Sequence, residues 1–373
     1  MKILIVLNYY WPYISGLSEC ARSLAEELAK DHDVTVLTSK HKKDLAGFET
    51  INGVKVIRKN ILFHISKGYI SPSFIFSFMA LKKNADVVNL HLPMAEAGLF
   101  GRLTPERKLV LTYHCDINLS PSLFGRLITK AMDLSSVVSL KKASSIVVSS
   151  KDYARYSRIL PRYEDKLQEI HPTSPFYKEI SNQTKTDVSN YINIGFCGRI
   201  VEEKGIDILL KAAPIVKKSI PNARFLIAGD YKAVAGGSVY DKLKETIGWD
   251  ESYVTFLGKL TQRQLKDFYN SLDLFVLPSI NSLEAFGMVQ VEAMLSGVPV
   301  VASNLPGVRE IVRQTGMGRI VEVSNVEALA AGIIDVILNK EVYIKERTVV
   351  EERFGIESAV KKYIALFQKN QNI

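Results

Sequence analysis

LFVLPSINSLEAFGMVQVEAMLSGVPVVA, residues 274–302, contains a predicted strand, a predicted helix and a second predicted strand in succession. The apolar run 274–278 is typical of a buried strand, and it ends at Pro278. The pattern from Phe286 to Ser296 predicts a helix, and the apolar run 298–302 predicts the next strand. Strand, helix and strand in this order indicate one unit of a parallel sheet.

The same alternation continues through the whole chain. Helical patterns lie between the strand-like runs, for example at 18–30 and 72–83. Two successive series of this kind predict an α/β fold with two Rossmann-like, doubly wound domains. The expected strands are 2–8, 33–38, 54–58, 86–91, 108–114 and 145–149 in the first series, and 193–198, 224–229, 253–257, 274–278, 298–302 and 319–323 in the second.

A polar stretch from Glu179 to Asn190 has the composition of a linker and separates the two series. We therefore expect an N-terminal domain at 1–180, a C-terminal domain at 181–355 and a final helix within 356–373. Ligands of open α/β sheets bind beyond the carboxyl ends of the strands. The expected site is a cleft between two facing domains.

Length and composition narrow the class of protein. The chain has 373 residues, 47% of them apolar and 23% charged, as expected for a globular protein of two domains. Its cysteines, Cys20, Cys115 and Cys197, are widely spaced, which argues against a disulfide framework or a zinc site and for a reducing compartment. No apolar run approaches the roughly 18–20 residues that span a bilayer. We expect a cytoplasmic protein, and a peripheral position on the inner face of the cytoplasmic membrane stays open.

Positive charge is concentrated in the first half of the chain. Residues 1–180 contain 25 Lys and Arg against 17 Asp and Glu, a net of +8, and residues 181–373 contain 23 against 22, a net of +1. Such asymmetry indicates an anionic partner, either a phosphate-bearing acceptor or an anionic membrane surface, with nucleic acid disfavoured. The alternative is that scattered surface lysines are simply commoner in this half.

Two carboxylates flank an aromatic residue and a glycine in the opening stretch. Gly287 lets the backbone approach a ligand closely, and the expected helix end at Phe286 to Met288 offers free N–H groups to a diphosphate. Glu284, just before the helix, can accept hydrogen bonds from sugar hydroxyls. Glu292, within the helix, can accept them from a ribose. The alternative is a surface acid followed by an ordinary helix.

The pattern Glu284-x-Phe286-Gly287-x4-Glu292 resembles the signature of retaining nucleotide-sugar glycosyltransferases with two Rossmann-like domains, the GT-B fold, and of the GT4 family in particular. The resemblance covers essentially the whole chain. It implies transfer of a sugar to an acceptor hydroxyl with the anomeric configuration retained. It also implies an acceptor-binding first domain, a donor-binding second domain and a closing C-terminal helix that crosses back to the first domain.

Gly198-Arg199-x4-Lys204-Gly205 is similar to a second motif of the same family. Arg199 offers a fork of donors and Lys204 a mobile point charge, both suited to a diphosphate. They would also stabilise the charge on the departing diphosphate. The alternative is a solvated helix start. No metal site and no cofactor are expected, and the nucleoside-diphosphate sugar is a co-substrate.

His114 ends a predicted strand and resembles the family histidine that reaches the donor sugar. His91 ends another strand, and a structural role is equally open for it. Asp116 is a weaker candidate for orienting the acceptor. In the loop after the first strand the family usually has two glycines, but here Gly16 is followed by Leu17. The prediction that Gly16 contacts the donor therefore rests on one glycine.

Two other classes share parts of this pattern. A nucleotide-sugar 2-epimerase of the same architecture would turn over the donor without an acceptor. A catalytically silent sugar-nucleotide-binding module would be expected to lack Glu284, Arg199 or Lys204, which are all present. For the acceptor, the apolar segments 61–83 and 123–142 are edged by lysines, which is typical of membrane-surface contacts and equally of core-facing helices with basic outer faces. The acceptor is thus expected to be lipid-linked or phosphorylated.

Overall fold

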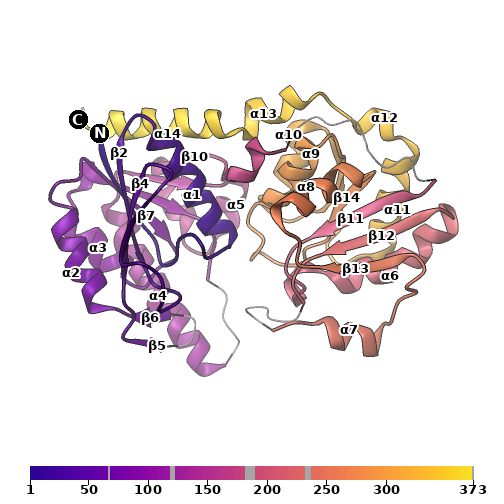
Figure 1. Ribbon diagram of the computed structural model, residues 1–373, viewed down its shortest axis with the longest axis horizontal. Coiled ribbons are helices and arrows are strands. Elements are labelled where there is room, and N and C mark those ends of the chain that lie inside the picture. The colour runs from indigo at the N-terminus through magenta and orange to yellow at the C-terminus, as the bar shows by residue number, and fades with distance from the viewer. Residues whose placement is uncertain (66–67, 118–121, 181–189, 232–236, 372–373) are drawn as a thin grey trace. The chain divides into compact units, whose positions relative to one another are not determined.

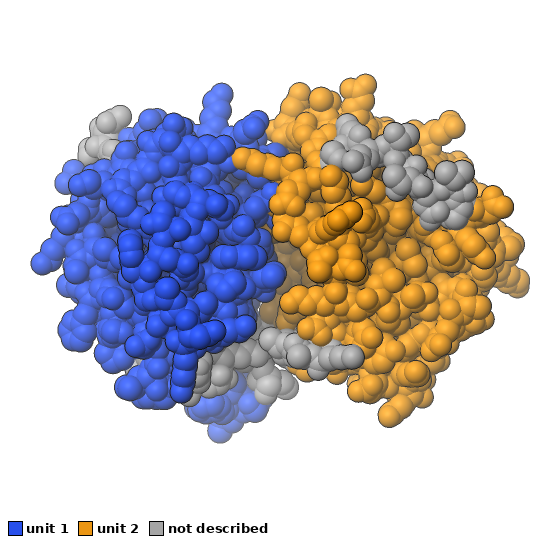
Figure 2. Space-filling view, viewed as in Figure 1, with its two compact units in different colours: residues 1–175, 355–373 blue, residues 176–354 orange. Residues whose placement is uncertain are grey.

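The computed structural model describes residues 1–65, 68–117, 122–180, 190–231 and 237–371. It contains two compact units (Figure 2): Met1–Pro175 with Gly355–Ile373 form unit 1, and Phe176–Phe354 form unit 2. Residues 181–189 of the predicted linker lie outside the described residues. The domain limits given above and the cleft between the domains stay predictions.

Unit 1 is built on an eight-stranded sheet in the order β10-β9-β8-β7-β1-β2-β4-β3 (Figure 1). Neighbouring strands are parallel except β3, which pairs antiparallel with β4 at the edge. The central strands are buried on both faces, so most of their residues are apolar. The strands are β1 Lys2–Val6, β2 Asp33–Ser39, β3 Phe48–Ile51, β4 Val54–Lys59, β7 Val87–Leu92, β8 Leu109–Tyr113, β9 Ser145–Val148 and β10 Leu167–Glu169; β5 Phe63–Ile65 and β6 Gly68–Ile70 form a separate hairpin.

Helices cover this sheet, and the last helix of the chain is one of them. Helix α14 packs against α1, and the Tyr363 hydroxyl lies 3.1 Å from Thr112 Oγ1 of β8. Near its end, Asn370 donates to Ser144 Oγ at 2.8 Å. The helices of unit 1 are α1 Gly16–Leu28, α2 Pro72–Leu81, α3 Ala97–Leu103, α4 Leu123–Lys142, α5 Lys151–Tyr156 and α14 Ile356–Gln371.

Unit 2 is built on a six-stranded, wholly parallel sheet in the order β13-β12-β11-β14-β15-β16. The chain winds outward in one direction from β11 and in the other from β14, so the two halves of the sheet meet between these strands. The strands are β11 Ile192–Cys197, β12 Ala223–Ala228, β13 Val254–Gly258, β14 Leu274–Leu277, β15 Val300–Ser303 and β16 Gly318–Val321; the helices are α6 Ile206–Ser219, α7 Tyr240–Thr246, α8 Gln262–Ser271, α9 Met288–Leu295, α10 Val308–Thr315, α11 Val326–Leu338, α12 Lys340–Tyr343 and α13 Arg347–Phe354.

Both units confirm the predicted class of two doubly wound, Rossmann-like sheets. Each strand expected from the sequence is present, shifted at its ends by a few residues. The separate hairpin of β5 and β6 was not predicted, and neither were the short sheet strands β3 and β10. Both are short edge strands with polar residues, so they lack the apolar run by which buried strands are recognised.

Candidate functional site

The loops that follow β11 and β14 meet at the point where the strand order of unit 2 reverses. In doubly wound sheets ligands bind just beyond the carboxyl ends of the strands at this point. The loop after β11 contains Arg199 and Lys204, and the loop after β14 contains Glu284. The topology thus brings two separate sequence motifs to the position where a ligand is expected.

Backbone contacts hold these two loops together. The Ile280 N–H donates to the Glu203 carbonyl at 3.0 Å. Gly205 has φ +65°, and a Cβ built on it would lie 2.1 Å from the carbonyl oxygen of Pro278. Only glycine fits such a left-handed residue pressed against a neighbouring backbone. Gly205 therefore holds the backbone next to Lys204 close against the loop after β14.

Lys204 and Glu284 form an ion pair between Nζ and Oε2. Their side chains are only 17% and 13% exposed. The Ser279 hydroxyl also contacts Glu284 Oε2, at 3.4 Å. Glu284 is therefore a largely buried, paired carboxylate, although it lies in a loop. Ser279 belongs to no sequence motif, although a polar residue just after a buried strand can indicate a functional site.

Arg199 lies on the same loop but in a different setting. Its side chain is 51% exposed, and its guanidinium is paired with Glu203 at 3.0 Å. A surface pair of this kind contributes little to stability, so the guanidinium can exchange partners at low cost. The structure therefore joins Lys204 to Glu284 and keeps Arg199 on the outer side of the loop.

Helix α9 begins at Met288, two residues later than the predicted start. Gly287 caps it with φ +84°, and a Cβ there would lie 2.6 Å from Leu277 Cδ2. Phe286 is buried, with its ring centroid 5.9 Å from that of Phe354, so it anchors the loop and is not a surface contact. The backbone of this helix start, and not the Phe286 ring, is the part suited to an anion.

Glu292 lies one turn into α9 and is buried. Its Oε2 accepts a hydrogen bond of 2.7 Å from Tyr269 of α8. Burial, followed by the Glu292 charge, raises the pKa of Tyr269 well above its ordinary value, and the same two causes raise the pKa of Cys197 to about 12. Tyr269 thus positions Glu292, a contact that sequence spacing alone does not reveal. The ribose contact stays a prediction.

In unit 1, His114 follows β8 directly and His91 lies in the neighbouring strand β7. Their rings are hydrogen-bonded, with 3.0 Å between His91 Nδ1 and His114 Nε2. Burial lowers the pKa of His114 to about 4. It also lowers the pKa of His91, with the neighbouring His114 as the second cause. The pair is therefore neutral at neutral pH.

Asp116 and Gly16 occupy contrasting environments. Asp116 is buried, and its carboxylate accepts hydrogen bonds from Tyr113 and Ser157 at 2.7 Å and from the Arg158 N–H at 2.9 Å. These local partners give Asp116 a structural role, and the suggested contact with the acceptor stays a prediction. Gly16 is exposed at the start of α1, and a Cβ built on it would have no neighbour within 4 Å.

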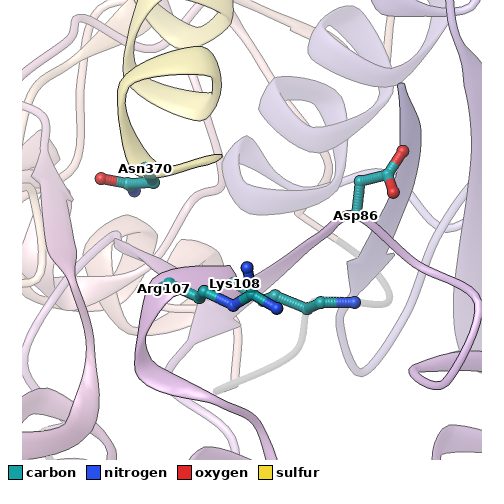
Figure 3. Close-up of a pocket in the computed structure, with 4 residues that line it drawn as sticks. All are labelled: Asp86, Arg107, Lys108 and Asn370. Carbon is teal, nitrogen blue, oxygen red and sulfur yellow. The ribbon is translucent and has the colours of Figure 1, made fainter. Parts of the chain in front are cut away.

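One hollow of about 230 Å³ lies away from these residues and is lined by Asp86, Arg107, Lys108 and Asn370 (Figure 3). Asp86 and Lys108 directly precede β7 and β8, so this hollow is at the amino ends of the strands, opposite to His114. Two of its lining residues already have polar partners. Asp86 accepts a hydrogen bond from the Lys2 N–H, and Lys108 donates one to the Ala85 carbonyl. We assign it no role in the chemistry.

No helix in the described ranges is long and apolar enough to cross a membrane. No group of three or more His, Cys, Asp or Glu in those ranges is arranged to hold a metal ion.

Family profiles match most of the chain. The profile of glycosyl transferases group 1 matches residues 178–353, and that of glycosyltransferase family 4 matches residues 14–172. An uncharacterized glycosyltransferase of Methanocaldococcus jannaschii is 29% identical over 89% of this chain and 88% of its own length. The phosphatidyl-myo-inositol mannosyltransferase of Mycobacterium tuberculosis is 32% identical, over 45% of this chain and 42% of its own length.

Solved structures share the fold. Sucrose-phosphate synthase from Thermosynechococcus elongatus superposes with a TM-score of 0.77 at 19% identity, covering 99% of this chain and 98% of that one. Anabaena HepE in complex with UDP-glucose superposes with a TM-score of 0.71 at 20% identity, covering 99% of this chain and all of that one. At such identities the likeness concerns the fold alone.

Proposed function

The chain belongs to the glycosyl transferases group 1, or GT4, family of GT-B glycosyltransferases, which use nucleotide-sugar donors, and we propose from this premise that it transfers the donor sugar to an acceptor hydroxyl with retention of the anomeric configuration. The observation that carries the proposal is the Lys204–Glu284 pair at the switch point of the unit 2 sheet. As an active glycosyltransferase it is neither the epimerase nor the silent module considered above.

The proposed donor site combines cations, a helix start and carboxylates. Lys204 and Arg199 bind the diphosphate and stabilise the charge that develops on it as the sugar leaves. The backbone from Phe286 to Met288 adds donors at the start of α9. Lys204 and Ser279 both contact Oε2 of Glu284, which leaves Oε1 to accept hydrogen bonds from sugar hydroxyls.

From unit 1 we assign two further contacts with the donor. His114 contacts the sugar, and Gly16 lets the backbone at the start of α1 approach the diphosphate. Glu292, held by Tyr269, contacts the ribose. These roles are taken from the family motifs, and each can be tested by substituting the residue.

We propose a lipid-linked or phosphorylated acceptor, presented at the inner face of the cytoplasmic membrane during surface polysaccharide or glycolipid assembly. The net charge of +8 on residues 1–180 supports an anionic partner. The name of the mycobacterial relative, a phosphatidyl-myo-inositol mannosyltransferase, supports a lipid acceptor. Exposed apolar side chains at the start of α4 support a membrane contact, as argued below.

The activity test is a panel of radiolabelled UDP-, GDP- and ADP-sugars incubated with the protein and a membrane extract. Label should move from one donor into the lipid phase, and NMR of the product should show the anomeric configuration of the donor. An inverted product would disprove retention. Release of an epimer without acceptor would disprove transfer.

Binding of the free nucleoside diphosphate tests the donor site separately. Arg199→Ala should weaken it in calorimetry by about 10-fold or more, since hydrogen bonds to charged groups contribute roughly 1.5–3 kcal/mol. Arg313→Ala is the matched control, because Arg313 is 50% exposed and pairs with Glu310 at 2.9 Å, much as Arg199 pairs with Glu203. Equal affinity in the two variants would remove Arg199 from the site.

Metal independence is part of the proposal, since Arg199, Lys204 and the start of α9 supply the positive charge that the diphosphate needs. Transfer should therefore continue in EDTA. A rate that collapses in the chelator and returns with Mn²⁺ or Mg²⁺ would contradict this.

A further inference from the structure

A continuous line of hydrogen bonds runs through the interior of the unit 1 sheet and ends at His114. It begins at the Val110 carbonyl, 3.2 Å from Asn89 Nδ2, which also lies 3.0 Å from Thr112 Oγ1. Asn89 Oδ1 is 2.9 Å from His91 Nε2, and His91 Nδ1 is 3.0 Å from His114 Nε2. Asn89 and His91 are both buried, at 0% and 1% exposure.

The direction of these bonds fixes where the protons are. A backbone carbonyl can only accept, so the amide NH₂ of Asn89 faces Val110 and its oxygen faces His91. His91 must then carry its proton on Nε2, and in the neutral ring Nδ1 is an acceptor. His114 must therefore donate from Nε2, which makes its Nδ1 the acceptor.

This line of hydrogen bonds does more than fill the core of unit 1. Strand β7 reads Val87-Val-Asn89-Leu-His91-Leu, and its residues are all buried. Polar side chains inside such a strand carry a desolvation cost that apolar residues avoid. Here the hydrogen bonds that offset this cost are aimed at one ring, the ring that the proposed function assigns to the donor sugar.

We propose that His91, oriented by Asn89, is a positioning residue that holds His114 as the Nε2–H tautomer, so that His114 Nδ1 presents a lone pair to a hydroxyl of the donor sugar. The inference rests on the proposed function for the identity of the ligand, but the tautomer itself does not depend on it. It also defines a preference: the donor sugar should bear a hydroxyl, as a hydrogen-bond donor, at the position facing His114.

The tautomer is measured directly by ¹⁵N NMR of the imidazole nitrogens at neutral pH. In the unsubstituted protein, His114 should show a protonated Nε2 and an unprotonated Nδ1. In His91→Leu this preference should be lost, and in His91→Gln it should return, because the glutamine carbonyl can accept from His114 and its amide can donate to Asn89. A protonated Nδ1 on His114 in the unsubstituted protein would overturn the proposal whatever the activity.

Kinetics with the donor found active supply the second measurement. His91→Leu should lose about 10- to 100-fold in kcat, the range found where a partner orients a metal-bound histidine. Affinity for the free nucleoside diphosphate should not change, because His114 is assigned to the sugar and not to the diphosphate. His91→Gln should recover most of the lost rate.

Ser23→Ala is the control for general loss of a buried hydrogen bond in the same unit, since Ser23 Oγ lies 2.9 Å from buried Thr173 Oγ1. It should keep its rate at a similar cost in stability. Equal rates in His91→Leu and in the unsubstituted protein would overturn the positioning role. If no donor is turned over at all, the proposed function fails, and the NMR result still decides the tautomer.

Discussion

Lys204 and Glu284 each supply the counter-charge that the other needs at its poorly solvated position in the fold. Both side chains are largely removed from water, and a charge in that setting is costly without a partner. The ion pair gives each group a partner at the carboxyl edge of the sheet. A diphosphate that contacts Lys204 and a sugar that contacts Glu284 would then meet groups already fixed in place, with little ordering left to do.

Glu284→Gln should abolish transfer and also destabilise unit 2, because Lys204 loses its counter-charge. The expected loss is about 1–3 kcal/mol in the free energy of unfolding, measured by denaturant titration. Adding Lys204→Met removes the stranded charge and should restore much of the stability without restoring transfer. If Glu284→Gln turned over donor at the normal rate, Glu284 would not belong to the site.

The buried histidines make stability depend on pH. Their pKa values are lowered in the folded chain, to about 4 for His114, whereas the pKa of an unfolded histidine is about 6.5. Between these two values the unfolded state binds more protons, so stability is lost as the pH falls from about 6.5 towards 4. His114→Asn should lose less stability than the unsubstituted protein over this window in thermal melts. Parallel pH curves for the two proteins would contradict the burial of His114.

Among the helices and strands, the candidate groups other than Glu292 lie where strands end or helices begin. Loops at the carboxyl ends of parallel strands carry side chains that the sheet does not need for its own packing. In unit 2 these are the loops after β11 and β14, and in unit 1 the loop after β1 and the residue after β8. The rigid sheets hold these short segments in place.

At the start of α1, Gly16 is not required by the fold, so its reason can be the approach of a ligand. Gly16 has an ordinary backbone conformation and open space around its Cα, so alanine fits without strain. Gly16→Ala should therefore leave stability unchanged or raise it by about 0.4–1 kcal/mol. Donor turnover should nevertheless fall, because the methyl group stands where the ligand approaches. A stable variant with normal KM and kcat would exclude that approach.

At the scale of the whole molecule, the exposed apolar residues decide between the two interpretations of the lysine-edged segments. In α2, Phe74 and Phe78 are buried and pack near Phe100, whereas Phe76 is exposed, as are Leu62 and Phe63 before the helix. At the start of α4, three large apolar side chains are exposed beside Arg126 and Lys130: Leu123, Phe124 and Leu127. Both segments therefore expose apolar side chains, and the membrane hypothesis is tested first at α4, where these side chains lie within residues 123–127.

Co-sedimentation with anionic vesicles tests this surface. The protein should bind at about 50 mM salt and be released at about 0.5 M, since salt screens attraction to the lipid charge. Serine at Leu123, Phe124 and Leu127 together should abolish binding. Serine at three exposed apolar residues of unit 2, Leu338, Val342 and Ile344, is the matched control and should not. Absence of binding at low salt would favour a soluble acceptor such as a sugar phosphate.

The two doubly wound sheets and the motifs of the donor site can be recognised in the amino-acid sequence alone. Buried parallel strands need continuous apolar runs, and helix starts need particular residues, so both leave local patterns in the chain. Gly205 and Gly287 belong to this group, because their left-handed backbone leaves little choice of residue.

Which of these residues are partners depends on the three-dimensional packing of the chain. Glu284 pairs with Lys204, Glu292 with Tyr269, and His91 with both Asn89 and His114. Most of these contacts join residues far apart in sequence, brought together by the order of strands within each sheet. Burial, which lowers the pKa of the histidines, is set by the same packing and leaves no mark in the spacing of residues. Partner and protonation state depend on three-dimensional neighbours, and for that reason a local pattern cannot specify them.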